Sequence, residues 1–140
     1  MTSSGAVLAS PRAILAGLAD PLGAMPRPLM EIRCSLDEEW TSVELVGRLD
    51  LAGVDQIQDE FASCTGERDA HAVIDCAGVD FIASMGIGLF VEAARALKPK
   101  GRRIVIFRPT ALVEETLRAT GVHNIADIVH DDRELAQLKG

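Results

Sequence analysis

The chain has 140 residues, 48% of them hydrophobic and 25% charged, which is the length and composition of one globular domain. Its net charge of −7 argues against a nucleic-acid-binding protein, and no apolar run is long enough to cross a bilayer. The four basic residues between positions 98 and 103 surround a proline and a glycine, so we interpret them as a solvated turn. We expect partners with a basic surface, and neither nucleic acid nor membrane.

Residues 1–28 differ from the rest of the chain. They are rich in small residues and leucine and carry four of the six prolines. They also lack the alternating and buried-strand patterns of the later sequence. We therefore predict an N-terminal extension, either flexible or with a short helix over 11–19, followed by one domain over residues 29–140.

From residue 30 the hydrophobic pattern predicts strands alternating with helices. The predicted strands cover 30–35, 41–49, 71–76, 103–107 and 125–129, and the first two form a hairpin. The predicted helices cover 51–64, 84–98, 109–119 and 131–138. This order predicts an α/β fold with a mixed, mainly parallel sheet and helices packed on it.

The three cysteines, Cys34, Cys64 and Cys76, form no metal-binding or redox motif. Each lies in or beside an apolar run. We therefore predict three unpaired thiols in a reducing cytosol.

Functional residues of an open parallel sheet gather at the edge where strands end and helices begin, here called the rim. The rim holds Asp50, a polar loop that leads from Asp75 to Ser84, and residues 108–110. Ser84 begins a predicted helix, so it has a structural interpretation as an N-cap beside any functional one. Gly86 and Gly88 follow it, which indicates either close packing on a strand or a backbone surface open to a ligand.

Enzyme and cofactor motifs are incomplete. Gly86 and Gly88 resemble part of a dinucleotide-binding fingerprint, but Val91 stands where its third glycine would be. A nucleophile elbow around Ser84 would need glycine at the position of Ile82. The three histidines have no evident catalytic or metal-binding partner. We expect no catalytic residue, no cofactor and no metal.

From about Leu29 to Leu138 the chain resembles a STAS domain, the fold of bacterial anti-sigma-factor antagonists. The matching segments are the hairpin ending in Gly47-Arg48-Leu49-Asp50, the strand Val73-Ile74-Asp75, and Val79-Asp80-Phe81-Ile82-Ala83-Ser84-Met85-Gly86. The helix that follows and the strand before Pro109 also fit.

The resemblance implies a partner-switching protein rather than an enzyme. Members of the family bind an anti-sigma factor that is also an ATP-dependent serine kinase, and so release the sigma factor. The kinase inactivates the antagonist by phosphorylating one serine at the start of the second main helix, and a serine phosphatase reverses this. Ser84 is the matching residue. The usual pattern is Asp-Ser-Ser/Thr-Gly, whereas this chain has Ala83-Ser84-Met85-Gly86.

The partner-binding part of the rim that this resemblance implies consists of Asp50, Asp80, Ala83, Ser84, Met85 and Gly86. Asp50 has two interpretations, as the N-cap of the helix over 51–64 and as a like charge beside a phosphorylated Ser84. An alternative function keeps the fold: a STAS module that is not phosphorylated and binds a transporter ATPase or a signalling complex. We expect a cytoplasmic protein; its oligomeric state is left open, with a homodimer as one option.

Overall fold

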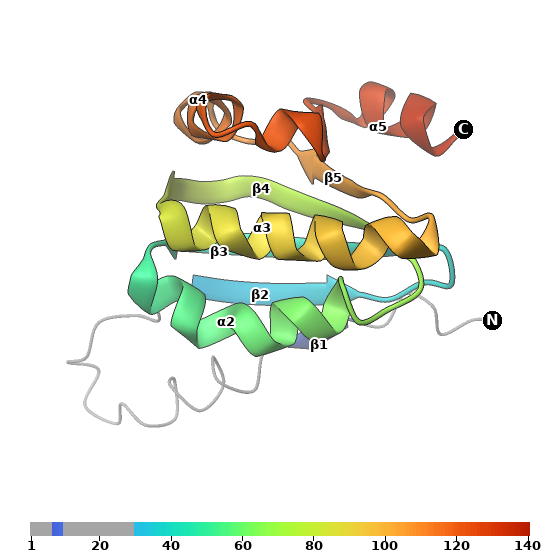
Figure 1. Ribbon diagram of the computed structural model, residues 1–140, viewed down its shortest axis with the longest axis horizontal. Coiled ribbons are helices and arrows are strands. Elements are labelled where there is room, and N and C mark those ends of the chain that lie inside the picture. Colours follow the sequence, from blue (N-terminus) through green and yellow to red (C-terminus); the bar gives the residue numbers. More distant parts are fainter. Residues whose placement is uncertain (1–6, 10–29) are drawn as a thin grey trace.

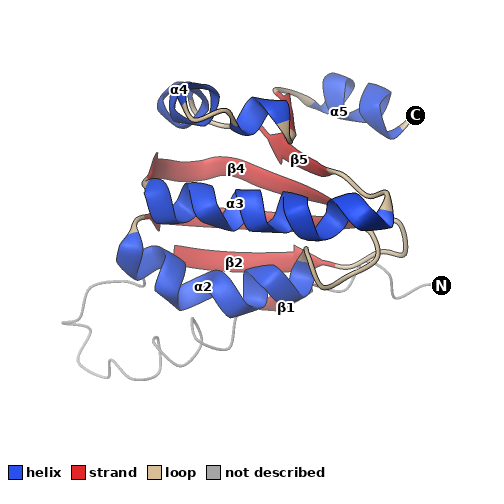
Figure 2. Cartoon of the chain, viewed as in Figure 1, coloured by secondary structure: helices blue, strands red, loops and turns tan. Residues whose placement is uncertain are grey.

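The computed structural model describes residues 7–9 and 30–140. Its strands are β1 (Val7–Ala9), β2 (Met30–Ser35), β3 (Trp40–Leu49), β4 (His71–Ile82), β5 (Ile104–Phe107) and β6 (Asp127–Val129). Its described α-helices are α2 (Leu51–Cys64), α3 (Ser84–Leu97), α4 (Ala111–Ala119) and α5 (Asp132–Lys139), with 3-10 turns at Lys98–Lys100 and Val122–Asn124. Figure 1 shows α2 and α3 side by side across one face of the sheet, and Figure 2 shows the alternation of strands and helices.

The described strands form one mixed sheet in the order β1-β2-β3-β4-β5-β6. β2 is antiparallel to both β1 and β3, whereas β3, β4, β5 and β6 run parallel to one another. The predicted hairpin followed by a mainly parallel sheet is therefore confirmed.

The core follows from the hydrophobic pattern of the strands. In β2, Met30, Ile32 and Cys34 are buried and alternate with exposed residues, because one strand face meets the helices. The four residues of β5 are all buried, as expected for a parallel strand covered on both faces. On the face opposite α2 and α3, Leu135 and Leu138 of α5 pack against buried residues of β4, β5 and β6.

The segment predicted as a polar loop after residue 76 is instead the second half of β4, which continues to Ile82. Its pairing with β3 shifts register twice, and Asp80 is an extra residue between Val79, which pairs with Gly47, and Phe81, which pairs with Arg48. Such bulges interrupt the two-residue alternation by which a strand is recognised in sequence. The loop prediction was wrong for that reason.

Within the first 28 residues, Val7–Ala9 forms an edge strand that pairs with Arg33–Ser35 of β2. The sequence analysis did not predict this strand. The helix predicted over 11–19 lies outside the described residues.

The prediction of three free thiols is wrong for two of them. A disulfide joins Cys34 of β2 to Cys64 at the end of α2, with their Cα atoms 6.5 Å apart. The two residues meet because Cys34 faces the helix layer and α2 lies over that strand, a contact between residues 30 positions apart. Cys76 remains a free, fully buried thiol, and burial followed by the nearby Asp75 raises the pKa of that thiol.

Alkylation followed by mass measurement tests this pairing. In denaturant without reductant, one cysteine per chain should be labelled, and prior reduction should raise the number to three. Without denaturant or reductant we expect almost no labelling, because Cys76 is buried and its thiolate is disfavoured. Three labels from freshly purified, unreduced protein would contradict the disulfide.

His130, after β6, links the two C-terminal helices through carboxylates. Its Nε2 lies 2.9 Å from Glu114 Oε1 of α4, and its Nδ1 lies 3.1 Å from Glu134 Oε1 of α5. The hydrogen bond with Glu114 is the main cause that raises the pKa of His130, and Glu134 adds to it. Burial alone would raise the pKa of Glu114, but hydrogen bonds from Arg118 and His130 outweigh it and lower that pKa.

A raised folded-state pKa means that protonated His130 stabilises the fold below the unfolded-state pKa of about 6.5. That stabilisation is lost as the pH rises through the folded-state pKa. The difference in free energy of unfolding between wild type and His130→Gln should therefore shrink as the pH rises above about 6.5. This decrease in the difference between the two free energies of unfolding should stay below about 1 kcal/mol, because the His130 side chain is half exposed. Denaturant unfolding at several pH values measures it, and a difference that grows with pH would contradict the assignment.

Candidate functional site

The rim predicted from the sequence is built by three neighbouring parallel strands. α2 follows β3, α3 follows β4 and α4 follows β5, so all three helices begin at the same edge of the sheet. The backbone N–H of Ala83 donates to the carbonyl of Leu49 at 2.9 Å, which ties the start of α3 to the end of β3. Figure 1 shows the first turns of α2 and α3 at one end of the molecule.

Ser84 is the first residue of α3, and Ala83 occupies the N-cap position with extended backbone. The interpretation of Ser84 as the cap is therefore wrong: the helix begins one residue earlier than a serine cap requires. Asp50, Thr110 and Asp131 each cap their helices with a side-chain oxygen, whereas the cap of α3 supplies none. The Ser84 side chain is exposed, with no hydrogen-bond partner among the described residues.

Asp50 caps α2 and also lies on the rim. Its Oδ1 accepts a hydrogen bond from Gly53 N at 2.9 Å, and its Oδ2 lies 3.5 Å from Arg48 Nε. The hydrogen bond from Gly53 is the main cause that lowers the pKa of Asp50, so the carboxylate stays charged at neutral pH. The interpretation of Asp50 as the N-cap of α2 is confirmed. Its negative charge also lies on the rim, at the end of β3 that contacts the start of α3.

The two glycines after Ser84 have different environments. A Cβ on Gly86 would lie 2.9 Å from Leu49 Cβ and 3.0 Å from Leu49 O, so Gly86 lets α3 pack closely on β3. A Cβ on Gly88 would meet no atom within 4 Å. The rim therefore needs glycine at position 86 but not at position 88.

Apolar side chains in the first helical turns are the main feature that the sequence analysis missed. Leu51 begins α2 and is 67% exposed, and Leu112 in the first turn of α4 is 56% exposed. Between them in chain order, Met85 of α3 is 49% exposed and was included in the predicted rim. Each of these three first turns thus exposes one large apolar residue at the same edge of the sheet. The sequence carried one signal for these residues. Each is a large apolar residue that lies one or two positions after a helix cap and outside the row of buried residues on its helix.

Arg48 also belongs to the rim and was not predicted as a site residue. Its guanidinium lies 4.4 Å from the centre of the Phe81 ring, beside Asp50. Asp80 is exposed at the bulge between the pairs that β4 makes with β3. The predicted residues Asp50, Asp80, Ala83, Ser84, Met85 and Gly86 therefore lie at the ends of two adjacent strands and the starts of their helices.

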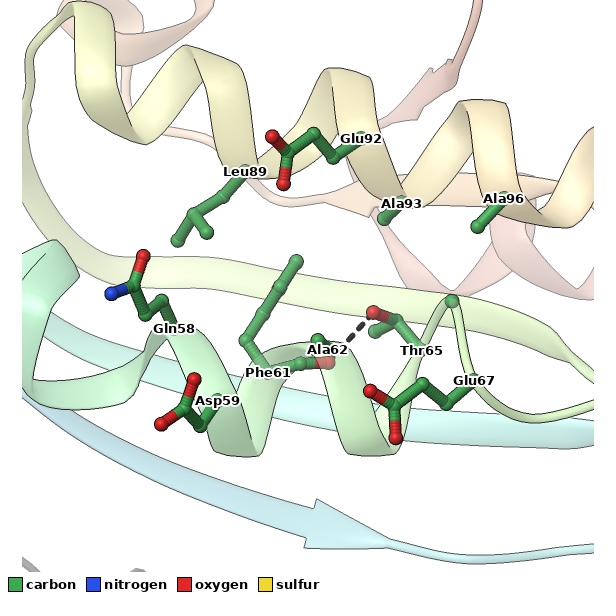
Figure 3. A pocket seen from close by; sticks show the side chains of 11 residues that line it. Gln58, Asp59, Phe61, Ala62, Thr65, Glu67, Leu89, Glu92, Ala93 and Ala96 are labelled. Atoms are coloured by element: carbon green, nitrogen blue, oxygen red, sulfur yellow. Dashed lines mark hydrogen bonds between the residues drawn. The ribbon is translucent and has the colours of Figure 1, made fainter.

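The groove between α2 and α3 lies away from Ser84. It encloses about 300 Å³, and Figure 3 shows Phe61 and Leu89 pointing into the space between the helices. Thr65 Oγ1 donates to the Phe61 carbonyl at 2.7 Å and closes the end of α2. The charged side chains that line the groove, Asp59, Glu67 and Glu92, are all acidic. An anionic ligand is therefore disfavoured there.

A family model described as "Mlab, STAS domain" matches residues 32–130. The chain belongs to the STAS domain family. Among solved structures, an anti-sigma-factor antagonist (STAS) domain protein from Planctomyces limnophilus matches at 20% identity and a TM-score of 0.67, over 78% of this chain and 97% of that chain. No protein of curated function gave a match.

The anti-sigma factor antagonist SpoIIAA matches in two forms. Its unphosphorylated form gives 18% identity and a TM-score of 0.65, over 78% of this chain and 96% of that chain. The phosphorylated form from Bacillus gives 17% identity and a TM-score of 0.58, over 76% of this chain and 98% of that chain.

The murine anion transporter Slc26a9 matches at 17% identity and a TM-score of 0.62, over 74% of this chain and 18% of that chain. These likenesses confirm the STAS fold. No helix in the described part of this STAS domain has the length and apolar character needed to span a bilayer.

Proposed function

We propose that this STAS domain is a cytoplasmic anti-sigma-factor antagonist without enzymatic activity. Its rim would bind an anti-sigma factor that is also an ATP-dependent serine kinase. The observation that carries the proposal is Ser84, an exposed hydroxyl at the start of the one described α-helix whose cap residue supplies no side-chain hydrogen bond. Structural likeness to an antagonist known in unphosphorylated and phosphorylated forms supports it.

Phosphorylation would act on the interface rather than on the fold. The kinase transfers the γ-phosphoryl group of ATP to Ser84 Oγ, the hydroxyl loses its proton, and ADP leaves. The added charge of about −1.5 to −2 lies at a helix N-terminus, where backbone amides and the helix dipole favour an anion. The same charge lies in a rim that exposes Leu51 and Met85 and already carries Asp50. Docking of an apolar partner surface would then bury an uncompensated phosphate, and a serine phosphatase would restore binding.

Phosphosite mapping tests the proposal. A kinase-like ATPase recovered with this protein from native lysate, incubated with it and ATP, should add one phosphate, at Ser84. Ser84→Ala should abolish the modification, and Ser63→Ala should not, because Ser63 is an exposed serine at the far end of α2. Phosphate on any other residue, or none with an active kinase, would contradict the proposed switch.

A second function is favoured by Ala83 and Met85, which replace the usual acidic and hydroxyl neighbours of the switch serine. In this alternative the same rim binds a transporter ATPase or a signalling complex without phosphorylation. The likeness to part of an anion transporter is compatible with it. Recovery of a transporter ATPase from lysate, with equal binding by wild type and Ser84→Ala and no phosphate at Ser84, would support this alternative.

A further inference from the structure

A second surface lies at the opposite end of α3 from Ser84. It is a cavity of about 620 Å³ between the last turns of α3, the start of β5 and the segment that leads into β6. Because α3 has 14 residues, its two ends lie about 20 Å apart. This cavity, here called the basic groove, is therefore separate from the rim.

The charge of the basic groove is opposite to that of the whole chain. Four cationic side chains line it, against one carboxylate: Arg95, Lys98, Arg102, Arg103 and Asp127. Arg102 pairs with Asp69 and Arg103 with Asp127, at N–O distances of 2.9 and 3.5 Å. Arg95 and Lys98 are exposed and have no partner among the described residues. The whole chain has a net charge of −7, so the positive charge of this groove is a local feature. Arg95 and Lys98 are the two cations in it that no described carboxylate neutralises.

The basic groove also has an apolar component. Val91 and Ala94 of α3 line it together with Ile104 of β5. Ile125, which is 47% exposed, also lines the basic groove. Cations at a helix C-terminus offset the helix dipole, which accounts for the charge of Arg95 and Lys98. That role explains neither the cavity nor the exposed isoleucine.

We infer that the basic groove binds a short acidic segment of a partner protein, one that carries an apolar side chain between its carboxylates. Arg95 and Lys98 would pair with the carboxylates, and Ile125 with the apolar side chain. The charge complementarity selects an acidic protein segment, because a small inorganic anion would leave Ile125 uncovered. Burial and then the positive charges of Arg102 and Arg103 lower the pKa of the neighbouring His71, as expected for a positive potential at this end of the sheet.

Fluorescence anisotropy with a labelled peptide of six glutamates and two central leucines tests this inference. The full chain should bind the peptide saturably, and the affinity should fall with added salt. Arg95→Gln combined with Lys98→Gln should weaken binding about tenfold or more, a change of about 1.4 kcal/mol. The matched control combines Arg33→Gln with Arg133→Gln, which removes the same charge from exposed sites elsewhere, and should bind as the wild type does. Ile125→Ala should weaken binding to a smaller extent.

The substituted side chains are all exposed, so each variant should keep the melting temperature of the wild type within a few degrees. Ser84→Glu should bind the peptide unchanged, which keeps this test independent of the proposed switch at the rim. Equal loss of binding in both double variants, equal binding of single-stranded DNA, or no saturable binding by the wild type would overturn the inference.

Discussion

Ser84→Glu is expected to weaken binding of the kinase partner by about tenfold or more while leaving the free energy of unfolding nearly unchanged. The fold should tolerate the change because Ser84 is exposed in the first turn of α3, where a carboxylate is favoured by the helix dipole. The interface should not, because the new charge lies on a rim that exposes Met85 and Leu51. Glutamate carries less charge than phosphate, so its effect should be smaller than that of phosphorylation.

Two variants make this expectation specific. Ser84→Ala should bind the partner as the unmodified protein does and should lose little stability, because the Ser84 hydroxyl caps nothing. Ser63→Glu adds the same charge near the far end of α2 and should bind normally. Titration calorimetry gives the affinities and denaturant unfolding the stabilities. Equal affinities of Ser84→Glu and the wild type for the partner would show that the rim is not part of the interface.

Alanine at three helical glycines should give three different stabilities. A Cβ at position 53 would lie 2.0 Å from the Arg48 carbonyl oxygen, which cannot move without disrupting β3. A Cβ at position 86 would lie 2.9 Å from Ile82 Cγ1 and Leu49 Cβ and 3.0 Å from the Leu49 carbonyl oxygen, so the start of α3 would have to move slightly away from β3. At position 88 it would meet nothing within 4 Å. The expected changes are a loss of about 3 kcal/mol or more at 53, a loss of about 1 kcal/mol at 86, and a gain of about 1 kcal/mol at 88.

Denaturant unfolding of the three variants measures this order. Gly88→Ala is the matched control, because it raises helix propensity without adding a contact. A Gly53→Ala protein that unfolds like the wild type would show that α2 does not pack on β3 in this register. Equal losses at positions 86 and 88 would show that the start of α3 is not held against Leu49.

The sequence predicted those features of the fold that depend on neighbouring residues. The helix over 51–64 was predicted with the bounds of α2 because its cap residue, Asp50, and its apolar spacing act locally. The parallel sheet followed from alternation of strands and helices. Ser84 was placed at the start of a helix that ends before Pro99 and Gly101, and its cap assignment had to move by one residue, to Ala83.

Features that depend on contacts distant in sequence were not predictable in this way. The Cys34–Cys64 disulfide needs α2 to lie over β2, and β1 needs the free edge of β2. The second half of β4 looked like a loop because its bulges break the alternation of buried residues. Leu51 and Leu112 were added to the predicted rim only when the structure showed that both side chains are exposed.

The most direct test of the proposed switch compares the affinities of unmodified and phosphorylated protein for the same kinase partner by titration calorimetry. We expect phosphorylation confined to Ser84 to weaken binding by more than about tenfold, with full affinity regained after phosphatase treatment. Equal affinities before and after stoichiometric phosphorylation of Ser84 would contradict a partner switch at this rim.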